Sequence, residues 1–314
     1  MLPALPAYRG IYATFCQRKP FVGISLYPAS VMMPKIAMPY PSILEFLCGK
    51  FPQVAADCWE RRIVQGKVLD DDGLPITSAT AYRPEGRIYY FREVEQEIVI
   101  PFSEKVLFHN DQILVCCKPH FLPVTPGGRF VDQCLLNRLR KSTGNHDLVP
   151  LHRIDRDTAG LVLFSANKET RARYSQLFNN GGMEKSYQAL AAVVGDPGER
   201  SWLVENRIVS GEPWFRMKTA PGQVNARSRI ALVESRDGLA RFELIPITGK
   251  THQLRVHMSE LGFGILNDRL YPALQAQGPD DFARPLQLLA KSIKFVDPCT
   301  GKTMSFESGR QLLW

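Results

Sequence analysis

Residues 151–166 read LHRIDRDTAGLVLFSA. The run that starts at Gly160 is short and apolar and contains a β-branched and an aromatic residue, which is typical of a strand inside a packed sheet. Asp155 lies just before this run, between Arg153 and Arg156, so we expect it on the loop that enters a core strand. The neighbouring positive charges favour the ionised carboxylate. Taken alone, such a segment is more often a surface salt bridge at a strand entrance than a functional site.

The composition is that of a globular protein with an anionic partner. The chain has 314 residues, of which 45% are hydrophobic and 22% charged, and its net charge is +8 with a pI near 9.1. Residues 1–101 contain 11 Lys or Arg and 10 Asp or Glu, whereas residues 102–314 contain 28 and 21. The excess of positive charge therefore belongs to the C-terminal two-thirds, and nucleic acid is the commonest anionic partner.

The cysteines and the apolar segments bear on the compartment. Seven cysteines occur without a C-x-x-C pair, which predicts neither a zinc site nor a disulfide framework and favours a reducing compartment. The apolar stretch Phe21–Met33 is too short to cross a membrane and is interrupted by Pro28. We therefore expect a cytoplasmic protein without a membrane partner, whose residues 1–40 form an irregular, proline-rich extension and not a signal peptide.

A small module is predicted for residues 41–98. Ser42 and Glu45 fit a capping box at the start of a first helix, and a second helix is expected over residues 55–65 before Gly66. A polar turn at residues 70–73 and an alternating segment at residues 87–92 predict a strand pair. This element order resembles a degenerate alpha-L motif, a small RNA-binding module, in which Arg61 and Arg62 would contact RNA. The alternative is a packing domain without a ligand.

Residues 99–314 predict a larger α+β domain. Its strands and helices do not alternate regularly, which favours a mixed, largely antiparallel sheet. Helical spacing places Val131, Leu135 and Leu139 on one face, and Leu254, Met258 and Leu261 on another. The expected strands are residues 113–118, 161–166, 187–194, 240–247 and 292–296, and a further helix is expected over residues 168–178.

Three kinds of site can be argued against from the residues. The segment Gly249-Lys250-Thr251 lacks the first glycine of a phosphate-binding loop, because Leu244 stands there. The histidines of the expected helix, His252 and His257, are five positions apart, which is poor spacing for a shared metal ion. Arginines beside Asp155 favour an ionised carboxylate, whereas a general acid must be protonated. The pattern favours a nucleophilic or electrostatically stabilising aspartate.

Four segments together resemble the ordered motifs of the RluA-type pseudouridine synthases over residues 102–310. They are HRIDRDTAGLVLF from His152, KSYQAL from Lys185, PITGKTHQLRVH from Pro246, and LAK from Leu289 followed by PCTG from Pro298. The chain departs from the family pattern at Ile154, at Ala159 and in the segment Asn267–Tyr271, which varies a commoner Gly-Asp-x-Leu-Tyr. None of these departures affects the aspartate.

The resemblance implies a cofactor-free isomerase that detaches uracil from its ribose and rejoins it through carbon 5. Asp155 would be the catalytic carboxylate, Arg255 its ion-pair partner, and Tyr187 the ring that packs on uracil. The uridine must be flipped out of structured ribosomal or transfer RNA, and Arg153 would fill the vacated space. We expect a monomer without a metal ion, in which RNA is bound by Arg153, Arg156, His152, Lys250, His252, Arg61 and Arg62.

Two other functions remain open. A catalytically idle RNA-binding factor could share the fold, although it would have no physical need for Asp155, Tyr187 and Arg255 together. A carboxylate-dependent nucleosidase would differ only in releasing free uracil. The sequence does not distinguish ribosomal from transfer RNA as the substrate.

Overall fold

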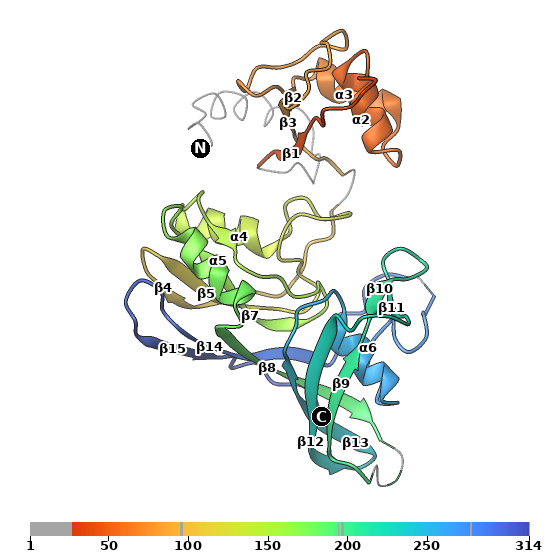
Figure 1. Ribbon diagram of the computed structural model, residues 1–314, viewed down its shortest axis with the longest axis vertical. Helices are drawn as coiled ribbons and strands as arrows, with labels where there is room; N and C mark the ends of the chain where they lie inside the picture. Colours follow the sequence, from red (N-terminus) through yellow and green to blue (C-terminus); the bar gives the residue numbers. More distant parts are fainter. Residues whose placement is uncertain (1–26, 95–96, 194, 196–197, 277, 314) are drawn as a thin grey trace. The chain divides into compact units, whose positions relative to one another are not determined.

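The chain divides into two compact units. The computed structural model describes residues 27–94, 97–193, 195, 198–276 and 278–313 (Figure 1). The first unit, called here the N-terminal unit, comprises the chain up to Ile98 together with Gly127–Asp132. The second, called the catalytic unit, comprises Val99–Pro126 and the chain from Gln133 onward. The catalytic unit contains every segment that carries the predicted chemistry.

The N-terminal unit packs two short helices against a three-stranded antiparallel sheet. The helices are α2 (Ile43–Lys50) and α3 (Ala56–Val64), and the sheet has the order β1 (Ala29–Met32), β3 (Arg87–Tyr90), β2 (Val68–Leu69). Ser42 is the N-cap, as expected, because its hydroxyl accepts the Glu45 N–H at 3.2 Å, and the Glu45 carboxylate accepts from the same hydroxyl at 3.4 Å. Buried aromatic rings, including Trp59, close the core between the layers.

One segment of the predicted proline-rich extension is regular. Residues 29–32 form β1 and pair with β3, whereas the prediction of an irregular segment rested on the prolines alone. The four residues Ala29–Met32 contain no proline, and the edge of β3 offers them backbone partners. The remainder of the extension up to residue 26 lies outside the described residues.

The catalytic unit is built on one large sheet. Among the nine strand pairings of this sheet within the described residues, only β14–β7 is parallel, which confirms the predicted mixed, largely antiparallel α+β fold. Its strand order is β4 (Lys105–His109), β5 (Ile113–Lys118), β7 (Ala159–Ser165), β14 (Leu288–Val296), β8 (Met183–Ala192), β13 (Leu239–Pro246), β12 (Ala226–Arg236), β9 (Ser201–Asn206), with β15 (Thr303–Glu307) on β14 and β6 (Val149–Pro150) on β7.

Three helices and a separate hairpin complete this unit. Helices α4 (Leu135–Thr143) and α5 (Arg171–Asn179) lie near β5 and β7, and α6 (Gln253–Glu260) lies beside the hairpin of β10 (Ile208–Ser210) and β11 (Met217–Thr219) (Figure 1). Tyr174 of α5 is fully buried against residues of β5 and β7. Both strands are buried at every position, which explains why their sequences are continuous apolar runs.

Two helix predictions need correction. The helix expected to include Val131 begins only at Leu135, and Val131 belongs to the N-terminal unit, where its N–H donates to the Glu97 carboxylate at 2.8 Å. Helix α6 was expected to bury only one apolar stripe. Its residues Gln253–Met258 are all buried, including Arg255. Apolar spacing could not reveal the second buried face, because polar side chains with partners occupy it.

Gly160 allows the sheet to bring the key segments together. Its φ is +113°, and an added Cβ would lie 2.2 Å from the Ala290 carbonyl oxygen, so no other residue fits here. Gly160 pairs with Ala290 on β14, and Ala290 pairs on its other side with Tyr187 on β8. The loop that ends at β7 therefore lies two strands from Tyr187.

Candidate active site

Asp155 lies on the loop between β6 and β7, as predicted. Its side chain is 27% exposed, and Arg255 donates from a terminal nitrogen to Asp155 Oδ2 at 3.2 Å. His252 Nε2 lies 4.0 Å from the same oxygen. The carboxylate is thus fixed by a cation from α6 and is still open to solvent, which are the conditions for a carboxylate that meets a substrate.

Arg255 connects Asp155 to a second carboxylate. Its Nε and its other terminal nitrogen donate to the two oxygens of Asp268 at 2.7 and 2.6 Å. Burial alone would lower the pKa of Arg255, but the hydrogen bonds and charge of Asp268, with the charge of Asp155, raise it above its ordinary value. The bidentate pair orients the guanidinium, so that its remaining nitrogen faces Asp155.

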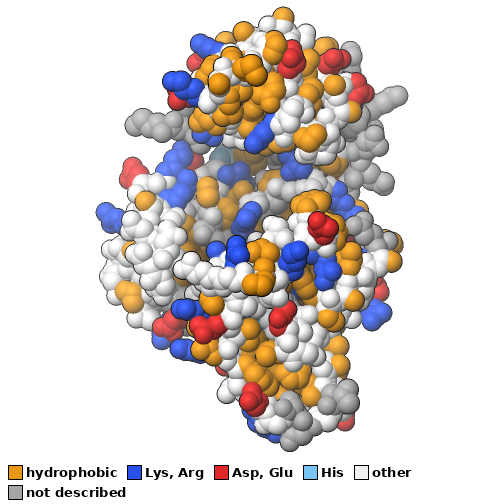
Figure 2. Space-filling view, turned by 45° about the vertical axis from the view of Figure 1, so that its right-hand side comes forward, with side chains coloured by type: hydrophobic (Ala, Val, Ile, Leu, Met, Phe, Trp, Pro, Cys, Tyr) orange, Lys and Arg blue, Asp and Glu red, His pale blue; other side chains and the backbone are white. Residues whose placement is uncertain are grey.

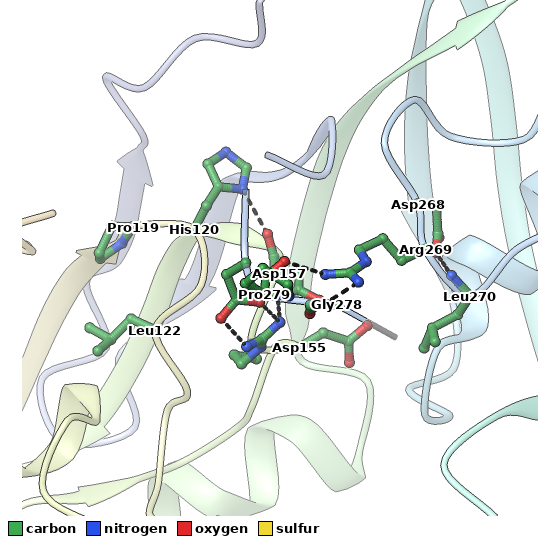
Figure 3. Close-up of polar contacts among 12 residues, drawn as sticks. Pro119, His120, Leu122, Asp155, Asp157, Asp268, Arg269, Leu270, Gly278 and Pro279 are labelled. Carbon is green, nitrogen blue, oxygen red and sulfur yellow. Dashed lines mark hydrogen bonds and ion pairs between the residues drawn. The ribbon is translucent and has the colours of Figure 1, made fainter. Parts of the chain in front are cut away.

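The sequence analysis assigned no role to Asp268. Its side chain is fully buried, and Oδ1 also accepts the N–H groups of Leu270 and Tyr271 at 2.8 and 3.2 Å. The next residue, Arg269, donates to the carbonyls of Gly278 and Pro279 (Figure 3). The only sequence signal was the position of Asp268 in the segment Asn267–Tyr271, and spacing alone does not pair it with a residue thirteen positions earlier.

Tyr271 and His252 lie beside this ion-pair chain. The Arg255 guanidinium lies 5.3 Å from the centre of the Tyr271 ring, and the Tyr271 hydroxyl is 3.0 Å from His252 Nδ1. Burial lowers the pKa of His252, although the charge of Asp155 opposes this effect. At neutral pH His252 is therefore uncharged and leaves Arg255 as the cation bound to Asp155. His252 was predicted as an RNA-binding residue, and the structure brings it to Asp155.

Tyr187 lies on β8, two strands away from β7, and is close enough to Asp155 for the carboxylate charge to act on its hydroxyl. The ring is partly buried and packs against the apolar cluster of β8, β13 and α6. Burial raises the pKa of the Tyr187 hydroxyl, and the negative charge of Asp155 raises it further. The phenol therefore remains protonated at neutral pH. It offers a ring face and an O–H group next to the carboxylate.

The arginines on either side of Asp155 lie in other environments, whereas Arg255, which the motif resemblance names as the ion-pair partner, binds the carboxylate. Arg156 forms a two-fold hydrogen bond with Asp280, both distances being 2.9 Å, and an ion pair with Asp157 at 2.8 Å. Arg153 is exposed. The cation that binds Asp155 is Arg255, which lies one hundred positions away along the chain.

Lys118 supports the loop from beneath. Its buried Nζ donates to the carbonyls of Pro119, Leu122 and Arg156 at 2.9, 2.7 and 2.8 Å. Burial lowers the pKa of Lys118 to about 7, while Asp157 and Asp155 oppose the shift. Three acceptors use all three hydrogens of the ammonium, so this geometry favours the charged form. The sequence analysis did not identify Lys118, which ends a wholly buried strand.

His120 holds the same loop at Asp157. Its Nδ1 lies 2.7 Å from the Asp157 carbonyl oxygen (Figure 3). Burial lowers the pKa of His120 to about 4, so the ring is neutral and donates this hydrogen bond. The loop that carries Asp155 is thus fixed at two successive carbonyls, those of Arg156 and Asp157.

The other predicted RNA-binding residues lie in different environments. Lys250 and Arg61 are exposed, and Arg61 is 3.9 Å from Asp57. The Nε2 atom of His152 accepts the Leu163 N–H at 3.1 Å, and its ring stacks on Phe178. Arg62 is buried, with its guanidinium over the Trp59 ring. The side chains of His152 and Arg62 therefore make contacts within the protein that stabilise the fold.

Neither a metal centre nor a membrane-spanning helix is found within the described residues. No group of three or more His, Cys, Asp or Glu side chains there could hold a metal ion. The described helices are also all too short or too polar to cross a bilayer.

The chain is similar to known enzymes that modify RNA. The family of RNA pseudouridylate synthases matches residues 112–260. The dual-specificity RNA pseudouridine synthase RluA of Escherichia coli O6:H1 is 31% identical over 209 residues, which cover 65% of this chain and 91% of that enzyme. An uncharacterized RNA pseudouridine synthase of Synechocystis is 27% identical over 73% of this chain and 79% of its own length.

Solved structures agree in fold. The human RNA pseudouridylate synthase domain containing 1 superposes with a TM-score of 0.55 at 20% identity and covers 68% of this chain and 86% of its own. The human RNA pseudouridylate synthase domain containing 4 superposes with a TM-score of 0.51 at 25% identity, over 66% of this chain and 88% of its own. With the identity to the bacterial enzyme, these likenesses show that the chain belongs to the RluA-type RNA pseudouridine synthases and is an isomerase acting on RNA.

Proposed function

We propose that this protein isomerises a uridine in structured ribosomal or transfer RNA, with Asp155 as the catalytic carboxylate and without a cofactor. The observation that carries the proposal is the ion-pair chain from Asp268 through Arg255 to Asp155. It keeps one negative charge fixed, partly desolvated and yet 27% exposed. An oriented charge of this kind costs little reorganisation when a substrate arrives.

The reaction needs one bond broken and one formed. The N1–C1′ bond of the uridine breaks, uracil turns, C5 bonds to C1′, and the C5 proton is lost while N1 gains a proton. Asp155 either attacks the sugar or the base, or stabilises the positive charge that develops on the sugar. No oxidant or other co-reactant is required, because product and substrate have the same atoms.

The neighbours of Asp155 suit the remaining tasks. The neutral Tyr187 phenol supplies a ring against which uracil can pack and an O–H group that can exchange a proton. Reaching Asp155 requires the uridine to leave its stack, at a cost of a few kcal/mol. Arg153, which is exposed two residues before Asp155, would fill the space that the base vacates.

The charge distribution supports a structured RNA as the substrate. Lys and Arg side chains are dispersed among apolar ones on the face drawn in Figure 2, and Lys250 at the start of α6 is exposed. Dispersed cations follow a phosphate backbone without reading bases. We include exposed Arg61 of the N-terminal unit in this role. Arg156 is a weaker candidate, because Asp280 and Asp157 already bind it.

The oligomeric state and the compartment follow from the same residues. All the side chains assigned to the chemistry come from one chain and one unit, so we propose that a monomer is active. The free cysteines in the described part of the chain include Cys48 and the exposed Cys299. Free thiols suit a reducing cytoplasm.

The test compares Asp155→Asn with Asp157→Asn. Asp155→Asn removes one charge at nearly constant shape, so we expect pseudouridine formation to fall on the order of 10⁴-fold or more, as when a member of a catalytic unit is removed. Asp157→Asn removes a carboxylate that binds Arg156, and we expect it to stay within about tenfold of the wild type in this scheme. Pseudouridine is mapped in RNA from cells that lack the gene and carry each variant.

Two outcomes would contradict the assignment. Asp155→Asn activity within tenfold of the wild type would remove Asp155 from the chemistry. Release of free uracil as the main product, measured by chromatography after single turnover, would indicate a nucleosidase.

A further inference from the structure

The hairpin β10–β11 presents an unusually exposed aromatic side chain. Trp214 lies in its turn and is 84% exposed, whereas Trp59 in the N-terminal unit is 1% exposed. The Phe215 ring meets the indole edge-on, with centroids 5.8 Å apart and an interplanar angle of 83°. An indole this exposed contributes little to the packing of the chain, so its apolar face is available to a partner.

The hairpin is anchored to the residues around the ion-pair chain. The Met217 N–H donates to the Tyr271 hydroxyl at 2.7 Å, and the Arg216 guanidinium lies 5.2 Å from the Tyr271 ring centre. Tyr271 is the ring that also contacts Arg255. At the other end of β11, the Thr219 hydroxyl donates to Glu260 of α6 at 3.0 Å. The hairpin therefore has a fixed position relative to the helix that carries Arg255 (Figure 1).

The turn itself is closed by backbone hydrogen bonds. Gly211 N–H donates to the Arg216 carbonyl and Arg216 N–H to the Pro213 carbonyl, both at 2.8 Å. Arg216 also donates from its guanidinium to the Pro272 carbonyl at 3.1 Å. A turn held in this way presents Trp214 with little freedom of its backbone. A ligand that stacks on the indole then has less conformational entropy to remove.

The charges on the hairpin select the kind of ligand. Lys218 on β11 and Arg207, which directly precedes β10, are both exposed, against one exposed acid in the turn, Glu212. A single indole among cations is too small for a protein interface, which needs a wider apolar core. It suits a nucleobase, which has an aromatic face and a phosphate on either side.

We propose that Trp214 is a stacking platform for an unpaired base of the RNA substrate, next to the uridine that reacts at Asp155. This inference rests on the proposed function, because it takes the RNA to be bound around the Asp155 carboxylate. Stacking on one flanking base would hold the strand open while the target is flipped out. The platform would add affinity for unpaired regions without selecting one base, since every base has an aromatic face.

Binding of two oligonucleotides by the full chain tests the proposal. The probes are a fluorescent 12-residue oligouridylate and the same backbone with abasic riboses, measured by anisotropy. Trp214→Ala should weaken oligouridylate binding about 5- to 150-fold, the range for loss of one base stack. Trp214→Phe should lose less, and the abasic backbone should bind both variants as it binds the wild type. Leu203→Ala is the matched control, since Leu203 is 59% exposed on β9.

The outcomes separate this proposal from the catalytic one. Unchanged oligouridylate affinity in Trp214→Ala, or an equal loss with the abasic backbone, would overturn the stacking proposal. An equal loss in Leu203→Ala would also overturn it, because it would indicate general apolar contact. None of these results depends on Asp155. If the catalytic role proposed for Asp155 were wrong, the Asp155→Asn enzyme would be active.

Discussion

Each unit of this protein buries an arginine, and the two ion-pair clusters differ in which charge is in excess. In the N-terminal unit, Arg62 and Lys67 both bind the single carboxylate of Glu93, and all three side chains are at most 16% exposed. In the catalytic unit, Arg255 binds two carboxylates. One of them, Asp268, is fully buried, and the other, Asp155, is 27% exposed.

The difference separates a structural cluster from a reactive one. Glu93 is enclosed by two cations and by the core around Trp59, so no charge of that cluster is offered to a ligand. Asp268 accepts two hydrogen bonds from Arg255 and so fixes the orientation of its guanidinium. The guanidinium in turn fixes the position of the Asp155 carboxylate. A surplus, partly exposed carboxylate beside a buried arginine is therefore the feature that supports the proposed active site.

The difference between the two clusters is tested most strongly by removing the enclosed carboxylate of each, Asp268 or Glu93. Asp268→Asn should cost about 3 kcal/mol or more in the free energy of unfolding, because it leaves Arg255 buried with a weaker partner. Since the guanidinium would no longer be oriented, we also expect pseudouridine formation to fall about 100-fold. Single-turnover rates and thermal unfolding measure the two effects.

Glu93→Gln is the matched variant in the N-terminal unit. It should cost a similar free energy of unfolding in that unit, about 3 kcal/mol, since two buried cations lose their carboxylate. The single-turnover rate at saturating RNA should not change. An Asp268→Asn enzyme with wild-type rate, or a Glu93→Gln enzyme as slow as Asp268→Asn, would show that the two clusters do not differ in the way we describe.

Acid should affect the two units differently. All six histidines lie in residues 109–257, so the first 98 residues contain none. Burial lowers the pKa of His120 and of His257 to about 4 and that of His152 to about 3. Between pH 6.5 and about 4 these side chains are protonated when the unit is unfolded and neutral when it is folded. Stability is therefore full above pH 6.5 and lost as the pH falls.

Each of these histidines contributes up to about 1.4 kcal/mol per pH unit in that range. We expect the thermal transition of the catalytic unit to fall steeply from pH 6.5 to 4.5, whereas the N-terminal unit has only its carboxylates to protonate. Calorimetry at intervals of half a pH unit would resolve the two transitions. His152→Gln should make the decline shallower. Parallel declines of both transitions with no change in His152→Gln would contradict this account.

Local sequence patterns predicted those elements that are built from local signals. The Ser42 N-cap and the buried strand Ile113–Lys118 were placed correctly, because a cap and a continuous apolar run act over a few residues. Strand β12 was not predicted. Its exposed arginines alternate with buried residues over residues 226–230, and its apolar run is confined to residues 230–233. The alternating pattern was present in the sequence and was not used.

The site divides in the same way. The motif resemblance named Asp155, Arg255 and Tyr187, and the structure places all three together. The resemblance could not show that Asp268 binds Arg255 or that Lys118 supports the loop, because both interactions are tertiary contacts between distant segments. The sequence placed positive charge on both sides of Asp155, but it could not show that the fold directs the Arg156 side chain to Asp280 and Asp157. Charge order along a loop does not determine the direction of a long side chain.

The smallest expected effect concerns the exposed arginines that flank the two buried clusters. Arg153 precedes Asp155, Arg61 precedes Arg62, and both are exposed. If each contacts one RNA phosphate, Arg153→Ala and Arg61→Ala should each lower the slope of log affinity against log salt by about 0.7 to 0.9. Arg153→Ala should in addition slow the single-turnover rate, since we propose that Arg153 also fills the space left by the flipped base. Affinity measured from 50 to 300 mM KCl gives the slopes.

An unchanged slope in Arg61→Ala would leave the N-terminal unit without the RNA contact proposed for it, and a wild-type rate in Arg153→Ala would confine Arg153 to phosphate binding.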